Sequence, residues 1–345
     1  MSLQKTIVRA LLKLPAPVLR AMAGGGQVVR DGRVLDARFQ FIAAQAAKVK
    51  LPDPLTPEVA RQGTEMLTFL FGGSREPGVN VEELVIPAPE ASLPARAYRP
   101  ARQDPASPLL VFYHFGGGVV GSIETCDAFC TILAAVTGGP VLSIDYRLAP
   151  EHRWPANLTD ARAAFDWART HAERFGVQGG RVAVGGDSMG GHMSAVLCQD
   201  LMRDGVPQPV YQLLIYPAAD LTMQGGSMVS CADAYPLTAA TMAFFMHHYL
   251  PEGTDMAHVR LSPLKAPDLT GLAPALVFTA GHDPLLDQGK AYADALSAAG
   301  VSVHYQCFDA MAHGFTAYTG GVPAADAACR VIAGYAGRAG RARQA

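Results

Sequence analysis

Charge and tryptophan are scarce in this sequence. Only 17% of the 345 residues are Asp, Glu, Lys or Arg, the formal net charge is −2, and Trp occurs twice. No cluster of Lys and Arg occurs outside the short C-terminal end, so the electrostatic footprint of a nucleic-acid-binding protein is missing. Half of the residues are hydrophobic, which lets a chain of this length bury a large core. We expect one domain with an accessory element and no nucleic-acid partner.

Cysteine is also sparse. The six cysteines are too scattered for the disulfide framework of a small secreted domain. Cys126 and Cys130 are four residues apart and could share a helix face, but no second Cys/His pair lies nearby to complete a tetrahedral metal site. We therefore expect free, buried thiols, no bound metal and a cytoplasmic location.

Long apolar runs are missing near the N-terminus. Residues 6–22 are apolar but carry interspersed basic residues and are interrupted by Pro15 and Pro17. A membrane span needs about twenty apolar residues and a signal peptide needs an uninterrupted apolar core, so neither is predicted. A basic amphipathic segment can lie on a membrane surface. An apolar stripe is more often buried, which favours a helix packed on its own protein.

From about Val81 onward, short β-rich runs alternate with helical stretches. The expected strands are residues 83–87, 94–99, 109–114, 140–146, 181–185, 211–216, 273–279 and 301–308. The expected helices are residues 126–136, 158–175, 190–203, 287–299 and 324–335. Several of the strands are continuously apolar, as buried parallel strands are. This alternation predicts an α/β protein with a mostly parallel eight-stranded sheet flanked by helices.

Two regions depart from the alternation. Residues 1–75 are predicted to form helices with loops, and residues 218–262 a loop followed by a helix around 237–249. Insertions into such sheets occur at strand ends, where ligands bind, so both regions are candidates for a helical cap. The remaining segments are expected to be a core at 76–217 and 263–337 and a flexible tail at 338–345.

A candidate nucleophile lies at a strand-to-helix junction. Gly186-Asp187-Ser188-Met189-Gly190 follows the expected strand at 181–185 as a G-x-S-x-G sequence. A serine in this position sits on a sharp, strained turn, and the flanking glycines let strand and helix approach closely enough to expose its hydroxyl. The N-terminus of the following helix favours developing negative charge at the same place. Because Gly and Ser are also common in ordinary turns, the motif alone does not identify a function.

A glycine-rich loop follows the expected strand at 109–114. It reads His114-Phe115-Gly116-Gly117-Gly118-Val119-Val120-Gly121, in the position where lipases and esterases carry an HGGG-type sequence. Free backbone N–H groups in such a loop can stabilise the oxyanion of acyl transfer. The spacing matches neither a P-loop nor a dinucleotide fingerprint, so phosphate binding is not predicted.

Five segments occur in a characteristic order between about residues 109 and 315. They are the glycine-rich loop, residues 145–152 with 154–156, the Ser188 turn, residues 280–285 and residues 311–315. In these segments the chain resembles the hormone-sensitive-lipase-like bacterial esterases of the α/β-hydrolase superfamily. The resemblance implies the α/β-hydrolase fold, with a cap made from the N-terminal residues and the insertion after Tyr216.

The glycine-rich loop departs from the family's pattern. The resemblance implies oxyanion donors at the backbone N–H groups of Phe115, Gly116 and Met189. The family carries a glycine at the position of Phe115, an aromatic residue at that of Gly118 and an alanine at that of Met189. A positive φ at Phe115 would strain its backbone, and its ring would narrow or redirect the acyl pocket.

A serine nucleophile requires a base and a carboxylate that orients the base. In α/β-hydrolases these follow in the chain order Ser, acid, His. His313 is the best base of the ten histidines, because it lies in a loop after the last expected strand. Asp283 follows the apolar strand at 273–279, where strand ends deliver catalytic side chains, and the family pattern chooses it as the acid. Asp309 is the rival acid, and Asp287 could cap or begin the next helix.

Other polar residues of these segments are expected to have supporting roles. Arg147 and Glu151 are predicted to support the oxyanion loop through hydrogen bonds, and Asp187 to support the serine rather than to catalyse. Trp154 and the aromatic residues of 244–249 are expected to pack, and their place near the cap makes a pocket role an alternative.

These residues together predict a carboxylic-ester hydrolase without a metal or an organic cofactor. Ser188 would attack the ester, His313 would transfer the proton and Asp283 would orient His313. The resemblance implies short- to medium-chain acyl esters as small-molecule substrates, and relatives often pair as homodimers. An amidase or lactonase with the same triad is an open alternative. A non-catalytic binding protein on the same scaffold is another, although the presence of His313 speaks against it.

Overall fold

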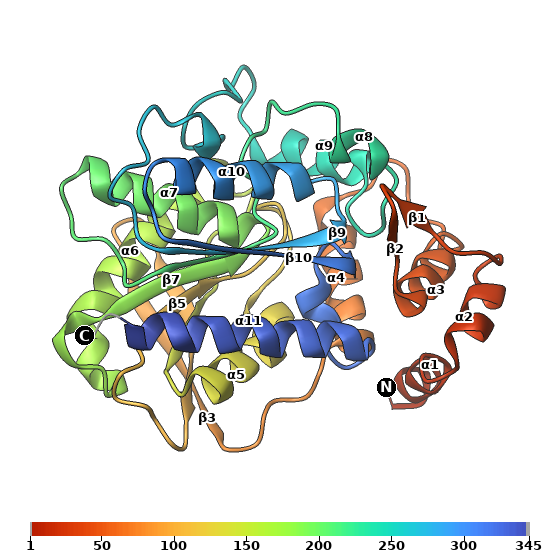
Figure 1. The fold of residues 1–345 in the computed structure, drawn as a ribbon, viewed down its shortest axis with the longest axis horizontal. Coiled ribbons are helices and arrows are strands. Elements are labelled where there is room, and N and C mark those ends of the chain that lie inside the picture. Colours follow the sequence, from red (N-terminus) through yellow and green to blue (C-terminus); the bar gives the residue numbers. More distant parts are fainter. Residues whose placement is uncertain (1, 343–345) are drawn as a thin grey trace.

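An eight-stranded mixed sheet forms the centre of the protein. A computed structural model describes residues 2–342 (Figure 1). The strands of the sheet are β3 (Val79–Pro87), β4 (Ser92–Pro100), β5 (Leu109–Tyr113), β6 (Val141–Ile144), β7 (Val182–Asp187), β8 (Gln212–Ile215), β9 (Ala275–His282) and β10 (Val303–Ala312). Their order is β10-β9-β8-β7-β5-β6-β4-β3, with parallel pairing from β10 to β6 and antiparallel pairing of β4 with β6 and β3. The predicted α/β fold with a mostly parallel sheet is confirmed.

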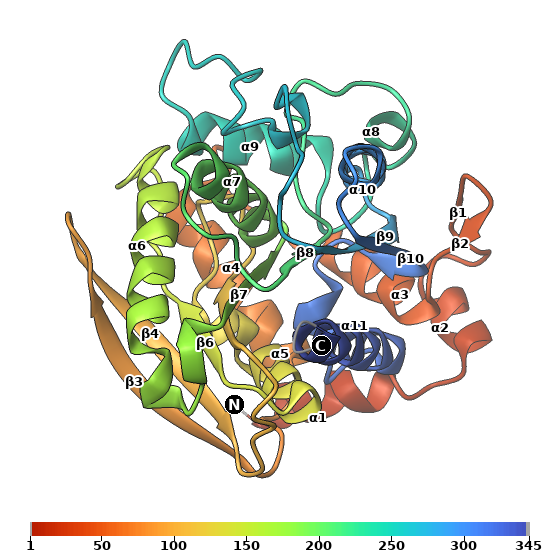
Figure 2. The ribbon, with the colours of Figure 1, turned by 60° about the vertical axis from the view of Figure 1, so that its left-hand side comes forward.

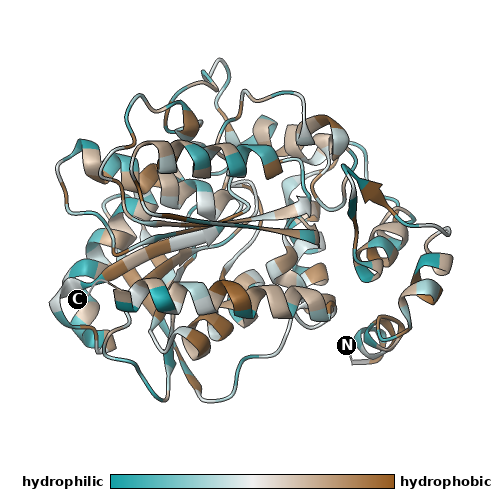
Figure 3. Ribbon diagram, in the orientation of Figure 1, coloured by the Kyte–Doolittle hydropathy of each residue, from teal (hydrophilic) through white to brown (hydrophobic). Residues whose placement is uncertain are grey.

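The inner strands are apolar because helices cover both faces of the sheet. Every residue of β5, β6, β8 and β9 is buried, as expected for parallel strands between two helical layers. The edge strand β3 keeps exposed residues along its length. Figure 3 shows hydrophobic residues concentrated in the strands and mixed with hydrophilic residues along the covering helices. Burial of this apolar surface is the main favourable contribution to folding.

Five long helices form the two covering layers. Helices α5 (Ile123–Thr137) and α11 (Pro323–Arg341) lie on one face, and α6 (Ala156–His171), α7 (Met189–Arg203) and α10 (Leu286–Ala298) lie on the other (Figure 1). Short 3-10 helices lie at Ala172–Phe175, Gln178–Gly180, Pro263–Lys265 and Phe315–Tyr318. All five helices expected in the core are present, with ends shifted by a few residues.

The C-terminal helix is longer than the sequence predicts. Helix α11 continues to Arg341, through the start of the tail expected at 338–345. Gly340 is buried against Pro108, and its carbonyl oxygen accepts a hydrogen bond from Arg181 Nη2 at 2.7 Å. Because these contacts hold the last turn of the helix, the tail does not begin at 338. Residues 343–345 of the expected tail lie outside the described residues.

Two segments lie beyond the covered sheet, at the end to which β9 and β10 point (Figures 1 and 2). The N-terminal segment contains α1 (Ser2–Leu11), α2 (Ala16–Met22), β1 (Val29–Arg30), β2 (Arg33–Val34), α3 (Ala37–Ala46) and α4 (Pro57–Phe71). The insertion after Tyr216 contains α8 (Ser227–Ser230) and α9 (Ala239–Tyr249). The small β1–β2 hairpin was not expected, since the sequence predicted only helices and loops here. The cap boundaries at 75 and at 218–262 stay predictions.

Helix α1 packs on the protein through its basic side. Lys5 Nζ lies 4.7 Å from the centre of the Phe69 ring, and Arg9 donates to the carbonyl oxygen of Leu70 at 3.2 Å. Leu3 and Ile7 point away and are 72% and 51% exposed. The expected packing of a helix on its own protein therefore occurs, but with part of the apolar stripe outward. Within residues 2–342, no helix is long and apolar enough to cross a membrane.

Helix α7 begins against the end of β5. A Cβ atom on Gly190 would overlap the carbonyl oxygen of Tyr113 and lie 3.1 Å from that of His114. A Cβ atom on Gly186 would in turn overlap the main chain of Gly190. Only glycine permits main chains to approach this closely. Two glycines therefore fix where the helix after Ser188 begins.

We expect Gly190→Ala to lower the free energy of unfolding by about 3 kcal/mol or more, because the new methyl group forces β5 and α7 apart. Gly63→Ala is the matched control: it lies within α4, and nothing lies within 4 Å of the added methyl group. That variant should be more stable than the wild type by about 0.5–1 kcal/mol, owing to helix propensity. Urea unfolding measures the free energy of unfolding of both variants. Equal values for the two variants would contradict this role of Gly190.

Candidate active site

Ser188 lies on the sharp turn between β7 and α7. Its backbone has φ 54° and ψ −113°, a region that non-glycine residues rarely adopt. The Ser188 N–H donates to the carbonyl oxygen of Ile215 at 2.8 Å, which ties the turn to the neighbouring strand β8. The side chain is 8% exposed and projects at the N-terminal end of α7. The surrounding structure thus holds the strained conformation that the motif predicted.

His313 connects Ser188 to Asp283. His313 Nε2 lies 2.9 Å from Ser188 Oγ, and His313 Nδ1 lies 2.7 Å from Asp283 Oδ2. The other carboxylate oxygen of Asp283 accepts the N–H of Leu285 at 2.8 Å, so both oxygens have a donor. Asp283 is fully buried at the end of β9, and His313 follows the last residue of β10. Three side chains that are distant in sequence therefore form one hydrogen-bonded chain.

The two other acids considered from the sequence lie elsewhere. The side chain of Asp309 is 72% exposed and faces Arg33, with 3.5 Å between Oδ1 and Nε. Asp287 stands in the first turn of α10, and its Oδ2 accepts the N–H of Ser227 at 2.7 Å. Asp287 therefore links the insertion to the core, and of the three aspartates only Asp283 has a hydrogen bond to His313 among the described contacts.

The glycine-rich loop presents backbone N–H groups without acceptors. In the described part of the chain, the amides of Phe115, Gly116 and Gly117 donate to no acceptor. The amide of Met189, the first residue of α7, belongs to the helix turn whose N–H groups have no intrahelical partner. Gly117, which was not predicted as a donor, thus has the same free amide as the two predicted loop residues.

Glycines carry the unusual backbone angles of the loop. Gly116, Gly117 and Gly118 have φ values of 127°, 60° and 75°. The non-glycine residues with positive φ among those described are Asp31, Ser188 and Tyr216. Phe115 is not one of them, so the strain that a positive φ would cause there does not arise.

His114 supports the loop from inside the protein. Its Nδ1 donates to the carbonyl oxygen of Phe115 at 2.7 Å, and its ring stacks on that of Tyr146 at 4.2 Å. The hydroxyl of Tyr146 donates to the His114 carbonyl oxygen at 2.8 Å. Burial lowers the pKa of His114, which keeps the imidazole neutral. His114 therefore acts as an uncharged brace under the start of the loop.

The predicted loop supports Arg147 and Glu151 differ in their contacts. Arg147 pairs with buried Asp160 at 2.7 Å and with Glu90 at 3.1 Å, and none of its hydrogen bonds within residues 2–342 reaches the loop. Glu151 accepts a hydrogen bond from the guanidinium of Arg61. The same guanidinium donates to the carbonyl oxygen of Val119 at 2.9 Å. The expected support of the loop therefore runs through Arg61. Nothing in the sequence marked this residue, because an arginine on a helix is usually solvated.

Asp187 forms a buried hydroxyl network beside the serine. Its Oδ2 accepts from Tyr216 Oη at 3.0 Å and from Thr316 Oγ1 at 2.6 Å, while its Oδ1 is buried without a hydrogen bond. The Tyr216 ring packs on the His313 ring, with 4.8 Å between ring centres. Burial raises the pKa of the Asp187 carboxyl to about 6. The hydrogen bonds from the two hydroxyl groups act in the opposite direction and offset only part of this rise. Asp187 thus contacts Tyr216, which packs on His313, and this agrees with the supporting role expected for Asp187.

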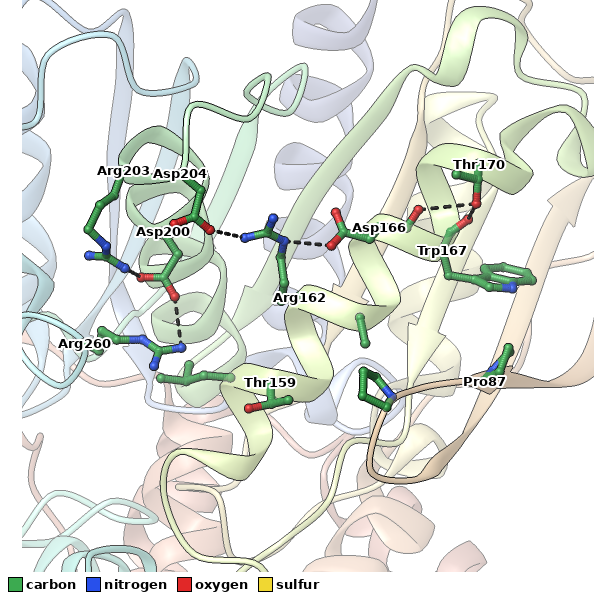
Figure 4. A pocket seen from close by; sticks show the side chains of 13 residues that line it. Pro87, Thr159, Arg162, Asp166, Trp167, Thr170, Asp200, Arg203, Asp204 and Arg260 are labelled. Atoms are coloured by element: carbon green, nitrogen blue, oxygen red, sulfur yellow. Dashed lines mark hydrogen bonds and ion pairs between the residues drawn. The ribbon is translucent and has the colours of Figure 1, made fainter.

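A separate hollow of about 650 Å³ lies over α6 and α7. Figure 4 shows Arg162 between Asp166 and Asp204, and Arg260 and Arg203 both paired with Asp200. None of the predicted site residues lines it. Its arginines are neutralised by aspartates, so the hollow offers no free cationic group. Within residues 2–342, no group of three His, Cys, Asp or Glu side chains could hold a metal ion.

Comparison with known proteins agrees with this geometry. Residues 110–317 match the family described as alpha/beta hydrolase fold. The carboxylic ester hydrolase LipN of Mycobacterium tuberculosis is 43% identical over 319 residues, which cover 89% of this chain and 84% of the relative. The ethyl acetate hydrolase of Pseudomonas putida is 35% identical over 287 residues, covering 81% and 90%.

A solved structure extends the likeness to three dimensions. An ester hydrolase from the metagenome of Lake Arreo, in complex with a derivative of bipyridine phosphonate, superposes with a TM-score of 0.82 at 40% identity. The match covers 87% of this chain and 96% of that one. The chain therefore belongs to the α/β-hydrolase fold family, among the hormone-sensitive-lipase-like esterases. The family resemblance seen in the motifs is confirmed.

The raised pKa of Asp187 predicts a pH-dependent stability. Folding favours the protonated carboxyl, so the stability that Asp187 contributes is present at low pH and lost as the pH rises through about 6. An amide oxygen in Asp187→Asn can accept the same two hydroxyl groups without a charge. We expect this variant to be more stable than the wild type at pH 8 by on the order of 2 kcal/mol, and the difference to shrink between pH 6 and pH 4.

Urea unfolding at pH 8 and pH 5 measures the difference. The control is Asp309→Asn, which changes an exposed carboxyl group. It should have the same free energy of unfolding as the wild type at both pH values. An Asp187→Asn protein that is less stable than the wild type at both pH values would overturn the assignment of a destabilising buried charge.

Proposed function

We propose that Ser188, His313 and Asp283 are the catalytic triad of a serine carboxylesterase. The observation that carries this proposal is the continuous hydrogen-bonded chain from Asp283 through His313 to Ser188 at the strained turn. The free amides of the glycine-rich loop support it, because a triad needs oxyanion donors beside the nucleophile. The reaction is the hydrolysis of carboxylic esters, the activity for which the relatives are named.

In the acylation step, Ser188 Oγ attacks the ester carbonyl carbon while His313 Nε2 takes the hydroxyl proton. The carbonyl electrons move to oxygen, which becomes an oxyanion. The amides of Phe115, Gly116 and Met189 are the proposed donors to this oxygen, with the Gly117 amide as a further candidate. The carbon–oxygen bond to the alcohol then breaks, and His313 returns the proton to the leaving alcohol.

In the deacylation step, water attacks the acyl-Ser188 carbonyl while His313 Nε2 accepts its proton. Collapse of the second oxyanion breaks the bond between the acyl carbon and Ser188 Oγ, His313 Nε2 returns the proton to Oγ, and the carboxylic acid is released. Asp283 accepts the Nδ1–H of His313 in both steps, which fixes the tautomer and stabilises the imidazolium. Ser188 thus acts through Oγ, His313 through Nε2, and Asp283 through the oxygen that accepts the His313 Nδ1–H.

Short- to medium-chain acyl esters are the proposed substrates. One relative is named ethyl acetate hydrolase, which supports a small acyl group. Amides and lactones pass through the same tetrahedral intermediate, so amidase or lactonase activity is the alternative on this triad. A non-catalytic binding role is disfavoured, because a site for binding alone has no need of a base aligned on a serine.

The proposed location is the cytoplasm, and the proposed assembly is a homodimer. All six cysteines are unpaired, which fits a reducing compartment. Strand β10 is one edge of the sheet, and an edge strand can pair with a second copy.

Replacing the nucleophile tests the proposed function. The wild type should hydrolyse p-nitrophenyl acetate and butyrate faster than the octanoate, and faster than the anilide of the same acid. Ser188→Ala should lower kcat/KM by at least about 10⁴-fold with an unchanged melting temperature, because it removes the attacking atom. Ester turnover that survives in the purified Ser188→Ala protein would show that another nucleophile acts.

A second pair of variants tests the acid. Asp283→Asn removes the carboxylate that orients His313 and should lower kcat by about 10⁴-fold. Asp309→Asn changes an exposed carboxylate and should leave kcat within about twofold. Steady-state kinetics on p-nitrophenyl acetate compares the two, and a larger loss in Asp309→Asn would reverse the assignment.

A further inference from the structure

Helix α9 of the insertion after Tyr216 packs directly on the glycine-rich loop. A Cβ atom on Gly117 would overlap the ring of Phe245, and one on Gly118 would lie 2.6 Å from Cδ2 of the Tyr249 ring. Phe245 and Tyr249 are four residues apart and therefore share one face of α9. The two rings occupy the space that side chains at 117 and 118 would fill. The helix can reach the loop only because both positions are glycine.

Tyr249 is anchored at both its hydroxyl and its main chain. The side chain is 1% exposed, and its hydroxyl donates to Asn157 Oδ1 at 3.0 Å. Its carbonyl oxygen accepts the N–H of Trp154 at 3.0 Å. A buried ring with two fixed ends cannot move away from Gly118 without breaking these bonds. The contact between α9 and the loop is therefore rigid at its C-terminal end.

Arg61, from helix α4, holds the other end of the loop. Its Nε donates to the carbonyl oxygen of Val119 at 2.9 Å, and its Nη2 donates to that of Ala149 at 2.9 Å. The N–H of Ala149 donates in turn to the carbonyl oxygen of Gly118 at 2.8 Å. One guanidinium thus fixes two adjacent loop residues, one directly and one through Ala149. Only a planar group with several donors can do this.

Glu151 holds the guanidinium in place. Its two carboxylate oxygens accept from Nη1 and Nη2 of Arg61 at 2.8 and 2.6 Å. The hydrogen bonds from Arg61 lower the pKa of Glu151 to about 2. The pair therefore stays charged throughout the neutral range, and the arginine keeps its orientation there.

We propose that Arg61, Phe245 and Tyr249 form a clamp that positions the oxyanion donors. The proposal rests on the proposed function, since it concerns the hole that the loop amides form. The clamp residues come from the two segments that lie beyond the sheet, on α4 and α9, and they touch the loop between Gly117 and Val119. Arg61 and Tyr249 are positioning residues, because they act through the loop. Docking of these two segments and completion of the oxyanion hole are thus one event.

Two variants test the clamp, each with a matched control. Arg61→Gln removes the bonds to two carbonyl groups, and Tyr249→Ala removes the ring over Gly118. Arg330→Gln removes an arginine on α11 that pairs with Asp326 and Glu76 at 2.9 and 2.6 Å. Tyr335→Ala removes a tyrosine ring on α11 that stacks on the His304 ring, with 3.7 Å between ring centres.

The readouts are kcat and KM on p-nitrophenyl acetate and the affinity for an aryl trifluoromethyl ketone, which adds to the serine and generates an oxyanion. We expect kcat to fall about 10- to 100-fold in Arg61→Gln and Tyr249→Ala, with KM within about threefold. Ketone affinity should weaken by a factor close to that in kcat, because both depend on the same donors. Both control variants should stay within about threefold of the wild type.

A structural role alone would give a different result. Unchanged kcat and ketone affinity in the folded fraction of both variants, even with a lower melting temperature, would overturn the clamp. If Tyr249→Ala does not fold, Tyr249→Leu replaces it, because the smaller aliphatic side chain leaves Gly118 partly uncovered and should lower kcat in the same way. A wild type without ester hydrolysis would refute the proposed function, whereas an active wild type with unaffected variants would refute only the clamp.

Discussion

The approach of three main chains at Gly190 is the constraint on which the site depends. Strand β5 ends against the first turn of α7, and the turn between β7 and α7 has no room for a side chain at Gly186 or Gly190. This contact leaves Ser188 in a strained conformation with its hydroxyl toward His313. The same contact brings the loop after β5 beside the serine. The proposed nucleophile and the proposed oxyanion donors therefore share one packing restraint, and the geometry of the candidate site follows from the core.

Much of the fold and of the candidate site could be predicted from the sequence. The run at β5 is wholly apolar, and those at β6 and β8 are short and mainly apolar, as expected for strands that are buried in a covered sheet. Asp283 could be chosen over Asp309 because it directly follows such a run. The contacts agree with this choice, since Asp283 is buried against His313 and Asp309 is exposed.

Other features carry no local signal. Strands β1 and β2 have two residues each and pair only with one another, too short for an alternating pattern. The strain that a positive φ would cause at Phe115 does not arise, because the loop places its positive φ angles on the three glycines that follow. Arg61 lies 58 residues before Val119 in the chain, and its helix has the ordinary composition of a surface helix. Contacts of this kind depend on how the segments dock, which periodicity and motifs do not encode.

Tyr216 gives the fold a further property. It is the last residue before the insertion begins to depart from the core, and its φ of 36° turns the chain out of β8. The same residue packs on the His313 ring and donates to Asp187, and its N–H donates to the carbonyl oxygen of Phe278 in β9. One buried tyrosine therefore fixes both the point where the insertion leaves the core and the position of the ring of His313, the proposed base. A change in the length or sequence of the residues beyond Tyr216 would therefore leave the contacts of the proposed base in place.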